Sequence, residues 1–217
     1  MTAATRLIVL NATKSGETAL VLHTLSPAYG RRSFLTNVGR KTSMSLFLPL
    51  NILDAEVHEN PRSDLWRAGN IKSACPLSGI RGNIYKNTMT LFMSEVLYRT
   101  VRDGVSEDGL FEWCERSIHT LDAMEGEFAN YHLRFLLEFA SALGFTPDIE
   151  SLSPFAGPHL ARLQTLLELG LAEFMLVPMS GAERNGIAES LLRYIGYHTE
   201  SSLNVRSLPV LRELYCQ

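Results

Sequence analysis

The spacing of the apolar residues changes at about Cys75-Pro76, and this change constrains the fold more than any other feature of the chain. Before it, β-branched and apolar residues form five short runs, separated by turn residues such as Gly16, Pro27 and Gly39. Runs of this kind, with no longer helical pattern among them, are typical of short β-strands. We therefore expect strands at residues 5–12, 18–25, 33–38, 50–57 and 65–73.

Beyond residue 82 the apolar residues recur every three or four positions, which is the spacing of helices that bury one face. This spacing predicts helices at residues 83–103, 106–126, 129–143, 158–170 and 181–197, and a short one after Ser207. Five short strands suit a small barrel, of which the OB-fold is a common five-stranded version. The expected fold class is therefore α+β, with an OB-fold barrel in residues 1–78 followed by an all-helical domain in residues 79–217.

The charges of the two parts differ in sign. Residues 1–75 contain nine Lys and Arg against five Asp and Glu, a net charge of +4, whereas the remainder carries −7. An asymmetry of this size predicts that a surface facing anions is concentrated at the N-terminal end.

Several classes of protein are disfavoured. Cys75, Cys114 and Cys216 are an odd number without Cys-x-x-Cys spacing, which argues against a disulfide framework or a cysteine zinc site. The first apolar run, residues 7–10, is too short for a signal peptide, and no later run is long enough to cross a membrane. We expect a cytoplasmic protein that does not bind membranes.

The chain contains none of the common catalytic motifs. It lacks the Gly-x-Gly-x-x-Gly, phosphate-loop, Gly-x-Ser-x-Gly and His-Glu-x-x-His patterns. Its six histidines are scattered, and its acidic residues fit a solvated helix face better than a two-metal nuclease site. We therefore expect no enzyme, no catalytic residue, no metal and no cofactor.

A basic group flanks the expected strand at residues 33–38. Its members are Arg31, Arg32, Arg40 and Lys41, with aromatic residues such as Phe34 nearby. Positive side chains beside exposed rings can follow a nucleic-acid backbone and stack on its bases. Alternatively, the charges are solubilising turn residues and the rings belong to the core. Composition and spacing leave both interpretations open.

The order of several short motifs resembles a known family. Tyr29-Gly30-Arg31, then Asn37-Val38-Gly39-Arg40-Lys41 and Leu48-Pro49-Leu50, resemble the N-terminal OB-fold domain of the RecO family of bacterial recombination and repair mediators. Residues 131–147, YHLRFLLEFASALGFTP, resemble its central helix end, and Asn204-Val205-Arg206-Ser207-Leu208 its closing segment. The resemblance spans nearly the whole chain. However, residues 148–170 contain no cysteine, where many members of this family carry a cysteine-ligated zinc module.

The resemblance implies a non-enzymatic mediator that binds single- and double-stranded DNA and promotes annealing of complementary strands. It also implies help for RecA in replacing single-strand-binding protein, RecR as a partner, and a bacterial, nucleoid-associated location. For phosphate contact we select Arg31, Arg32, Arg40 and Lys41, then Lys14 and Arg6, with Phe34 as a stacking residue. The rival hypothesis is a protein-interaction scaffold whose OB-like barrel does not touch DNA.

Overall fold

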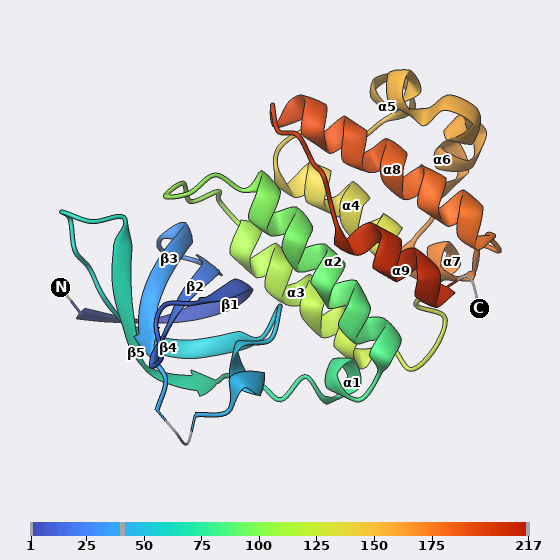
Figure 1. Cartoon of the computed structure of the whole chain (residues 1–217). Helices are drawn as coiled ribbons and strands as arrows, with labels where there is room; N and C mark the ends of the chain where they lie inside the picture. Colours follow the sequence, from blue (N-terminus) through green and yellow to red (C-terminus); the bar gives the residue numbers. More distant parts are fainter. Residues whose placement is uncertain (1, 40–41, 216–217) are drawn as a thin grey trace. The chain divides into compact units, whose positions relative to one another are not determined.

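A computed structural model describes residues 2–39 and 42–215 of the chain. It confirms the predicted fold class, because five strands close into an N-terminal barrel and helices follow (Figure 1). The strands are β1 (Thr2–Lys14), β2 (Ala19–Ser26), β3 (Gly30–Asn37), β4 (Ile52–His58) and β5 (Leu65–Ser73). The bounds expected for β5 agree with the structure, whereas β1 extends beyond its expected range at both ends.

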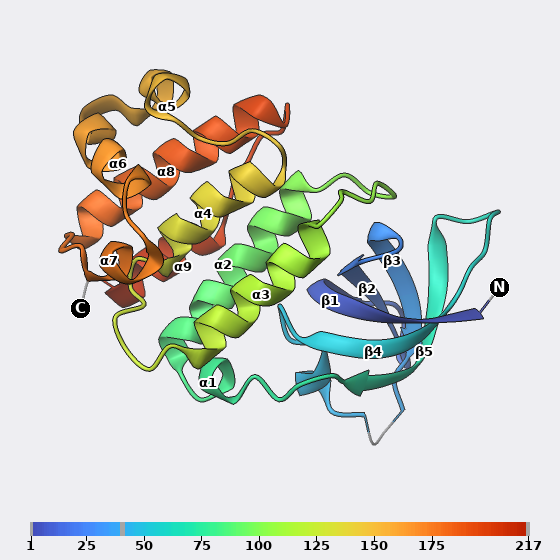
Figure 2. The same cartoon turned by 180° about the vertical axis from the view of Figure 1, so that it is seen from behind.

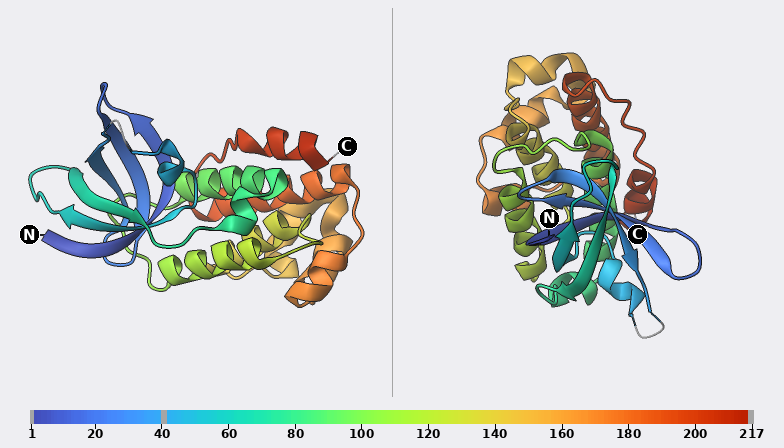
Figure 3. Two further views of the ribbon diagram at one scale, coloured as in Figure 1. Left: turned by 90° about the horizontal axis from the view of Figure 1, so that it is seen from below. Right: turned by 90° about the vertical axis from the view of Figure 1, so that its left-hand side faces the viewer.

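The strands are joined in the order β1-β2-β3-β5-β4. Figure 3 shows the barrel from two further sides. Every neighbouring pair is antiparallel except β3 and β5, which run parallel and share only the pairs Ser33–Leu65, Phe34–Trp66 and Leu35–Arg67. Alternate residues of each strand point inward and build the barrel core, as the period of a strand requires. The core includes Leu7, Val9, Leu22, Phe34, Leu53 and Val57. The short helix η1 (Met44–Phe47) adds the buried ring of Phe47.

The described helices follow the spacing of the sequence in most places. They are α1 (Ser78–Arg81), α2 (Ile84–Thr100), α3 (Leu110–Ala123), α4 (Tyr131–Ala142), α5 (Ile149–Ala156), η2 (Gly157–His159), α6 (Leu160–Leu167), α7 (Leu171–Leu176), α8 (Gly181–His198) and α9 (Ser207–Tyr215). As expected, α4 is buried along most of its length, and it lies between α2 and α8 (Figures 1 and 2).

Two helix predictions need correction. The helix expected from Ser106 begins only at Leu110, because Gly109 before it has a φ of +75°, which a right-handed helix does not allow. The helix expected at residues 158–170 is shorter, and α5 precedes it unpredicted. The N-cap of α5 is a capping box, in which Asp148 accepts from the Ser151 backbone and Ser151 bonds back. These hydrogen bonds lower the pKa of Asp148.

The chain divides into two compact units. One contains residues 1–78 with 97–119, and the other residues 79–96 with 120–217. The domain boundary at residue 78 stays a prediction. Among the described residues, no helix is both long and apolar enough to cross a membrane.

Residues 148–170 are held by apolar packing. Leu152, Ala156, Leu163 and Leu166 are fully buried, and Arg162 pairs with Glu183 of α8 through Nε and Oε1, 2.7 Å apart. Three further leucines nearby are less covered, since Leu160 and Leu167 are half-buried and Leu171 is 37% exposed. Across residues 2–39 and 42–215, no group of three or more His, Cys, Asp or Glu side chains is placed to hold a metal ion.

Lys86 of α2 is buried, and its side chain reaches the C-terminal end of α3. Its Nζ donates to the backbone oxygens of Asp122, at 3.0 Å, and of Met124. Burial lowers the pKa of Lys86, although the charges of Asp122 and Glu125 act in the opposite direction. A cation at this position satisfies carbonyls that a helix end leaves without partners.

Gly30 yields the first prediction. Its φ is +59°, and a Cβ added there would lie 1.8 Å from the carbonyl oxygen of Val105. Gly30→Ala therefore combines backbone strain of about 1–2 kcal/mol with overpacking of about 1–3 kcal/mol, and we expect it to lower the free energy of unfolding in urea by their sum. Gly16→Ala is the matched control, because its φ of +78° carries the same strain but nothing lies within 4 Å. Equal losses for both variants would contradict the prediction.

The second prediction concerns metal. Because buried leucines hold residues 148–170, we expect the purified protein to contain no stoichiometric zinc and to keep its thermal midpoint in chelator. Metal analysis and a thermal melt with and without EDTA check this. One zinc per chain, or a lower midpoint in EDTA, would show that a metal site exists.

Candidate nucleic-acid interface

Arg31 and Arg32 stand at the start of β3 and point to opposite faces of the strand, because side chains alternate along it. Each guanidinium lies over an aromatic ring rather than projecting freely. Arg31 is 4.5 Å from the ring centroid of Tyr98, and Arg32 is 4.0 Å from that of Trp66. Both side chains are half-buried, so the structure orients these two charges through contacts within the protein.

Further contacts hold Arg31 in place. Its Nη1 donates to the backbone oxygen of Val101 at 3.1 Å, and its own carbonyl accepts from the Gly104 amide at 2.8 Å. The ring of Tyr98, which Arg31 covers, also has the ring of His23 as a neighbour, with 5.0 Å between the two centroids. Burial first, and then the charge of Arg31, lower the pKa of His23. Both effects disfavour the charged form of His23.

Arg32 belongs to an aromatic cluster at one end of the barrel. The Trp66 ring meets that of Tyr29 edge to face at 5.1 Å, and the Tyr29 hydroxyl donates to Glu59 at 2.9 Å. Burial, followed by the hydrogen bond and charge of Glu59, raises the pKa of Tyr29. The Nε of Arg32 and the Nε1 of Trp66 are buried, and neither nitrogen has a hydrogen-bond partner among the described residues. An arginine stacked on tryptophan beside a tyrosine is one arrangement that can face both phosphates and bases.

Arg6 and Lys14 lie at different places on β1. The side chain of Arg6 is 50% exposed, pairs with Glu115 and lies 5.7 Å from the ring centroid of Phe111. Lys14 is exposed at the end of β1, next to the turn that leads to β2. In OB-folds the β1–β2 and β4–β5 loops and the neighbouring strand face commonly bind nucleic acids. Of these two residues, Lys14 has the position that suits such contact.

Phe34 requires a correction. Its side chain is fully buried in the barrel core, on the inner face of β3, so its ring has no surface on which a base can stack. The alternation of β3 places it there together with Arg32 and Thr36. Arg40 and Lys41 lie outside the described residues, and their role stays a prediction from the sequence.

Sequence reasoning missed four candidate residues. Trp66 partners Arg32, and the exposed side chains of Arg62, Arg67 and Lys72 add positive charge to β5 and the loop before it. Arg67 stands opposite Leu35 on β3 and His58 on β4, whereas Lys72 stands opposite the acidic Asp54. The expected strand at residues 65–73 already contained the signal for three of them, because aromatic and basic residues within a strand of a binding barrel are candidates for contact.

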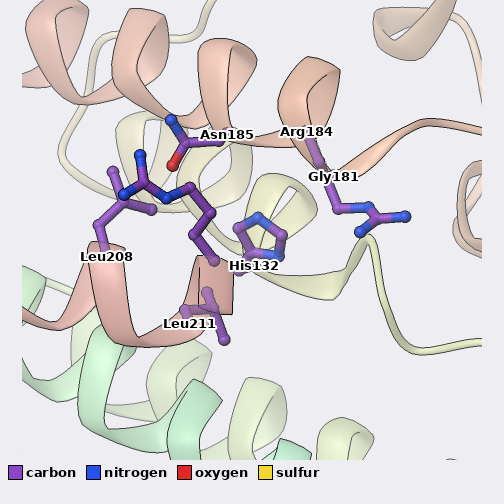
Figure 4. A pocket seen from close by; sticks show the side chains of 7 residues that line it. His132, Gly181, Arg184, Asn185, Leu208 and Leu211 are labelled. Carbon is purple, nitrogen blue, oxygen red and sulfur yellow. The ribbon is translucent and has the colours of Figure 1, made fainter. Parts of the chain in front are cut away.

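A small cavity in the helical unit does not offer a second binding site. It has a volume of about 20 Å³ and lies between α4, α8 and α9, where His132 points into it (Figure 4). This space holds about one water molecule. Burial, followed by the charge of Arg184, lowers the pKa of His132 to about 3, although a backbone hydrogen bond with Ala129 acts in the opposite direction. The imidazole is therefore neutral, and the cavity suits a structural water.

Comparison with known proteins identifies the family. Residues 81–153 match the family model for the C-terminal part of recombination protein O. The DNA repair protein RecO of Phocaeicola vulgatus is 30% identical over 96% of this chain and 97% of its own length. The RecO proteins of Flavobacterium psychrophilum and Bacteroides fragilis are 29% and 28% identical, each over more than nine-tenths of both chains. With a barrel and helices that fit this similarity along nearly the whole sequence, the chain belongs to the RecO family of DNA repair proteins.

Proposed function

We propose that the protein acts as a non-enzymatic mediator of DNA repair and recombination. It binds single- and double-stranded DNA, promotes annealing of complementary strands, and helps RecA to load where single-strand-binding protein covers the DNA, with RecR as a partner. Residues 1–78 form the DNA-binding domain, and residues 79–217 form the helical domain. The protein acts in the bacterial cytoplasm, at the nucleoid.

The observation that carries this proposal is the similarity to RecO proteins over nearly the full length of the chain. The chemistry of the barrel agrees with it. Lys14 and Arg62 are exposed at the β1–β2 and β4–β5 loops, and Arg67 is exposed on β5. Several modest phosphate contacts suit a protein that must exchange partners on DNA, because such contacts form and break without a deep specific site.

A protein-interaction scaffold is the second candidate. Arg6 pairs with Glu115, and Arg31 and Arg32 are covered by Tyr98 and Trp66, so three of the expected phosphate contacts have partners inside the protein. If these contacts persist, fewer cations face DNA. The two candidates differ in a measurable way, because only a DNA-binding protein shows affinity that falls steeply with salt.

The third prediction tests the DNA surface directly. We expect Lys14→Gln, Arg40→Gln and Lys41→Gln together to weaken binding to all sequences alike, because lost phosphate contacts carry no sequence information. Each single-strand phosphate contact contributes about 0.7 to the slope of log affinity against log salt, so losing three flattens the slope by about 2. Fluorescence anisotropy of a labelled oligonucleotide at several salt concentrations measures this slope.

The matched control is a triple variant of exposed arginines in the helical unit, Arg193→Gln, Arg206→Gln and Arg212→Gln. It removes the same number of charges and should change the slope less. A control that flattens the slope while the barrel variant does not would place the DNA surface on the helices. A wild-type protein without salt-dependent binding would favour the scaffold.

The fourth prediction separates structural from DNA-facing arginines. Arg31→Ala removes a cation–π contact worth about 0.5–2 kcal/mol and a hydrogen bond worth about 1 kcal/mol. We expect the free energy of unfolding to fall by about 1–3 kcal/mol, whereas Arg62→Ala, in an exposed loop, changes it by less than about 0.5 kcal/mol. Urea denaturation of both variants gives the comparison. An Arg31→Ala variant as stable as the wild type would show that the contact with Tyr98 contributes little.

A further inference from the structure

The wall of the barrel has a gap where β3 and β5 separate. The last pair that joins them is Leu35–Arg67, although β3 continues to Asn37 and β5 to Ser73. Beyond that pair, in the described part of the barrel, these two facing edges have no ladder between them. The helix η1 lies against this opening, and a cavity of about 250 Å³ remains between η1 and the two strands.

The lining of this cavity selects one kind of ligand. Its apolar part includes Phe47 and Ala68, which also belong to the barrel core. Hydroxyl and amide side chains, from Thr36, Asn37 and Thr42, supply its polar part, and none of the described lining residues is charged. A flat ring with apolar faces and a hydrogen-bonding edge fits such a lining. Pockets for drug-sized ligands have volumes of about 300–1,000 Å³. This cavity is smaller, so it suits a single ring system.

Gly69 is one of the residues that line this cavity. Nothing in the described structure lies within 4 Å of a Cβ built on it, and its φ is outside the left-handed region that favours glycine. Neither backbone strain nor packing therefore requires a glycine at this position of β5. A glycine within a strand often marks a place where a ligand approaches the backbone closely.

A positive charge stands within reach. Lys14 pairs with Leu20, and Leu20 pairs with Thr36, so the three residues form one row across β1, β2 and β3. Strands lie about 4.8 Å apart, which places Lys14 about 10 Å from Thr36 along this row.

We propose that the cavity between β3, β5 and η1 accepts one unpaired base of a single-stranded nucleic acid. The inference rests on the proposed DNA binding and adds to it a site that only single strands can fill, because a paired base is held inside its duplex. An added peptide strand is the alternative occupant, because the edge of β5 that faces β3 has no ladder from Ala68 to Ser73 in the part of the chain that the structure describes.

The test is Gly69→Leu, which adds a bulky side chain at the wall of the cavity. Anisotropy is measured for three labelled ligands: an oligothymidine, an abasic strand of the same length and a hairpin duplex. We expect the variant to weaken oligothymidine binding by on the order of tenfold, the fold-change that losing one stacked base produces. Binding of the abasic strand and the duplex should stay unchanged, and so should the salt slope, because no phosphate contact is lost.

Two further variants keep the result interpretable. Gly126→Leu places the same side chain at another glycine with nothing within 4 Å, and it should not change any of the three affinities. Asn37→Ala removes an exposed amide from the cavity rim without adding bulk, and it too should weaken only oligothymidine binding, even if Gly69→Leu does not fold.

Each other outcome overturns the inference. Unchanged oligothymidine binding by a folded Gly69→Leu variant leaves the cavity to another occupant. Equal losses for all three ligands, or a flatter salt slope, show that the site contacts the backbone and not a base. If the wild-type protein binds none of the ligands, the proposed function fails as well. If the wild-type protein binds the ligands but neither the Gly69 nor the Asn37 variant changes the affinity, the proposed function is retained and the base site is rejected.

Discussion

Three residue pairs between parallel strands close the barrel, and much of its surface chemistry depends on them. The pairs formed by Ser33, Phe34 and Leu35 of β3 bring Leu65, Trp66 and Arg67 alongside. On one side of this short seam, Trp66 meets Arg32 and Tyr29. On the other side, the strands separate and η1 fills part of the opening. A longer seam would remove the cavity, and a shorter one would leave the barrel open.

The arginines at the start of β3 show how a charged side chain can support the fold and still keep donors for other partners. An arginine head carries five N–H donors, so a guanidinium stacked on a ring keeps donors for other partners. Arg31 uses one of them on Val101 while its flat face covers Tyr98. Such packing limits the orientations of the side chain, so less entropy would be lost on binding another group. The cost is that its removal disturbs the fold as well as any binding.

The strands and the main helices were predictable because each depends on a local pattern. The short apolar run at residues 65–73 and the apolar spacing of residues 131–142 indicate a strand and a buried helix without further information. The partners of Arg31 and Arg32 were not predictable, because Tyr98 and Trp66 are distant in sequence and only the barrel topology brings them close. Phe34 was misassigned for another reason, because composition does not reveal which face of a strand points into the core. Helix α5 was missed because it has only eight residues and contains Pro154.

The buried position of Lys86 changes how the acidity of the helical residues should be understood. A cation gains affinity for DNA by displacing small ions from phosphates, and this requires direct contact. Lys86 cannot make such contact, because its ammonium group is occupied at the end of α3, and Arg134 and Arg162 are paired with Glu138 and Glu183. The net charge of −7 in residues 76–217 counts these occupied cations as if they could contact phosphates. Fewer positive groups of this part of the chain can therefore displace counterions from a polyanion. Residues 76–217 thus attract a polyanion even less than the sum of their charges indicates.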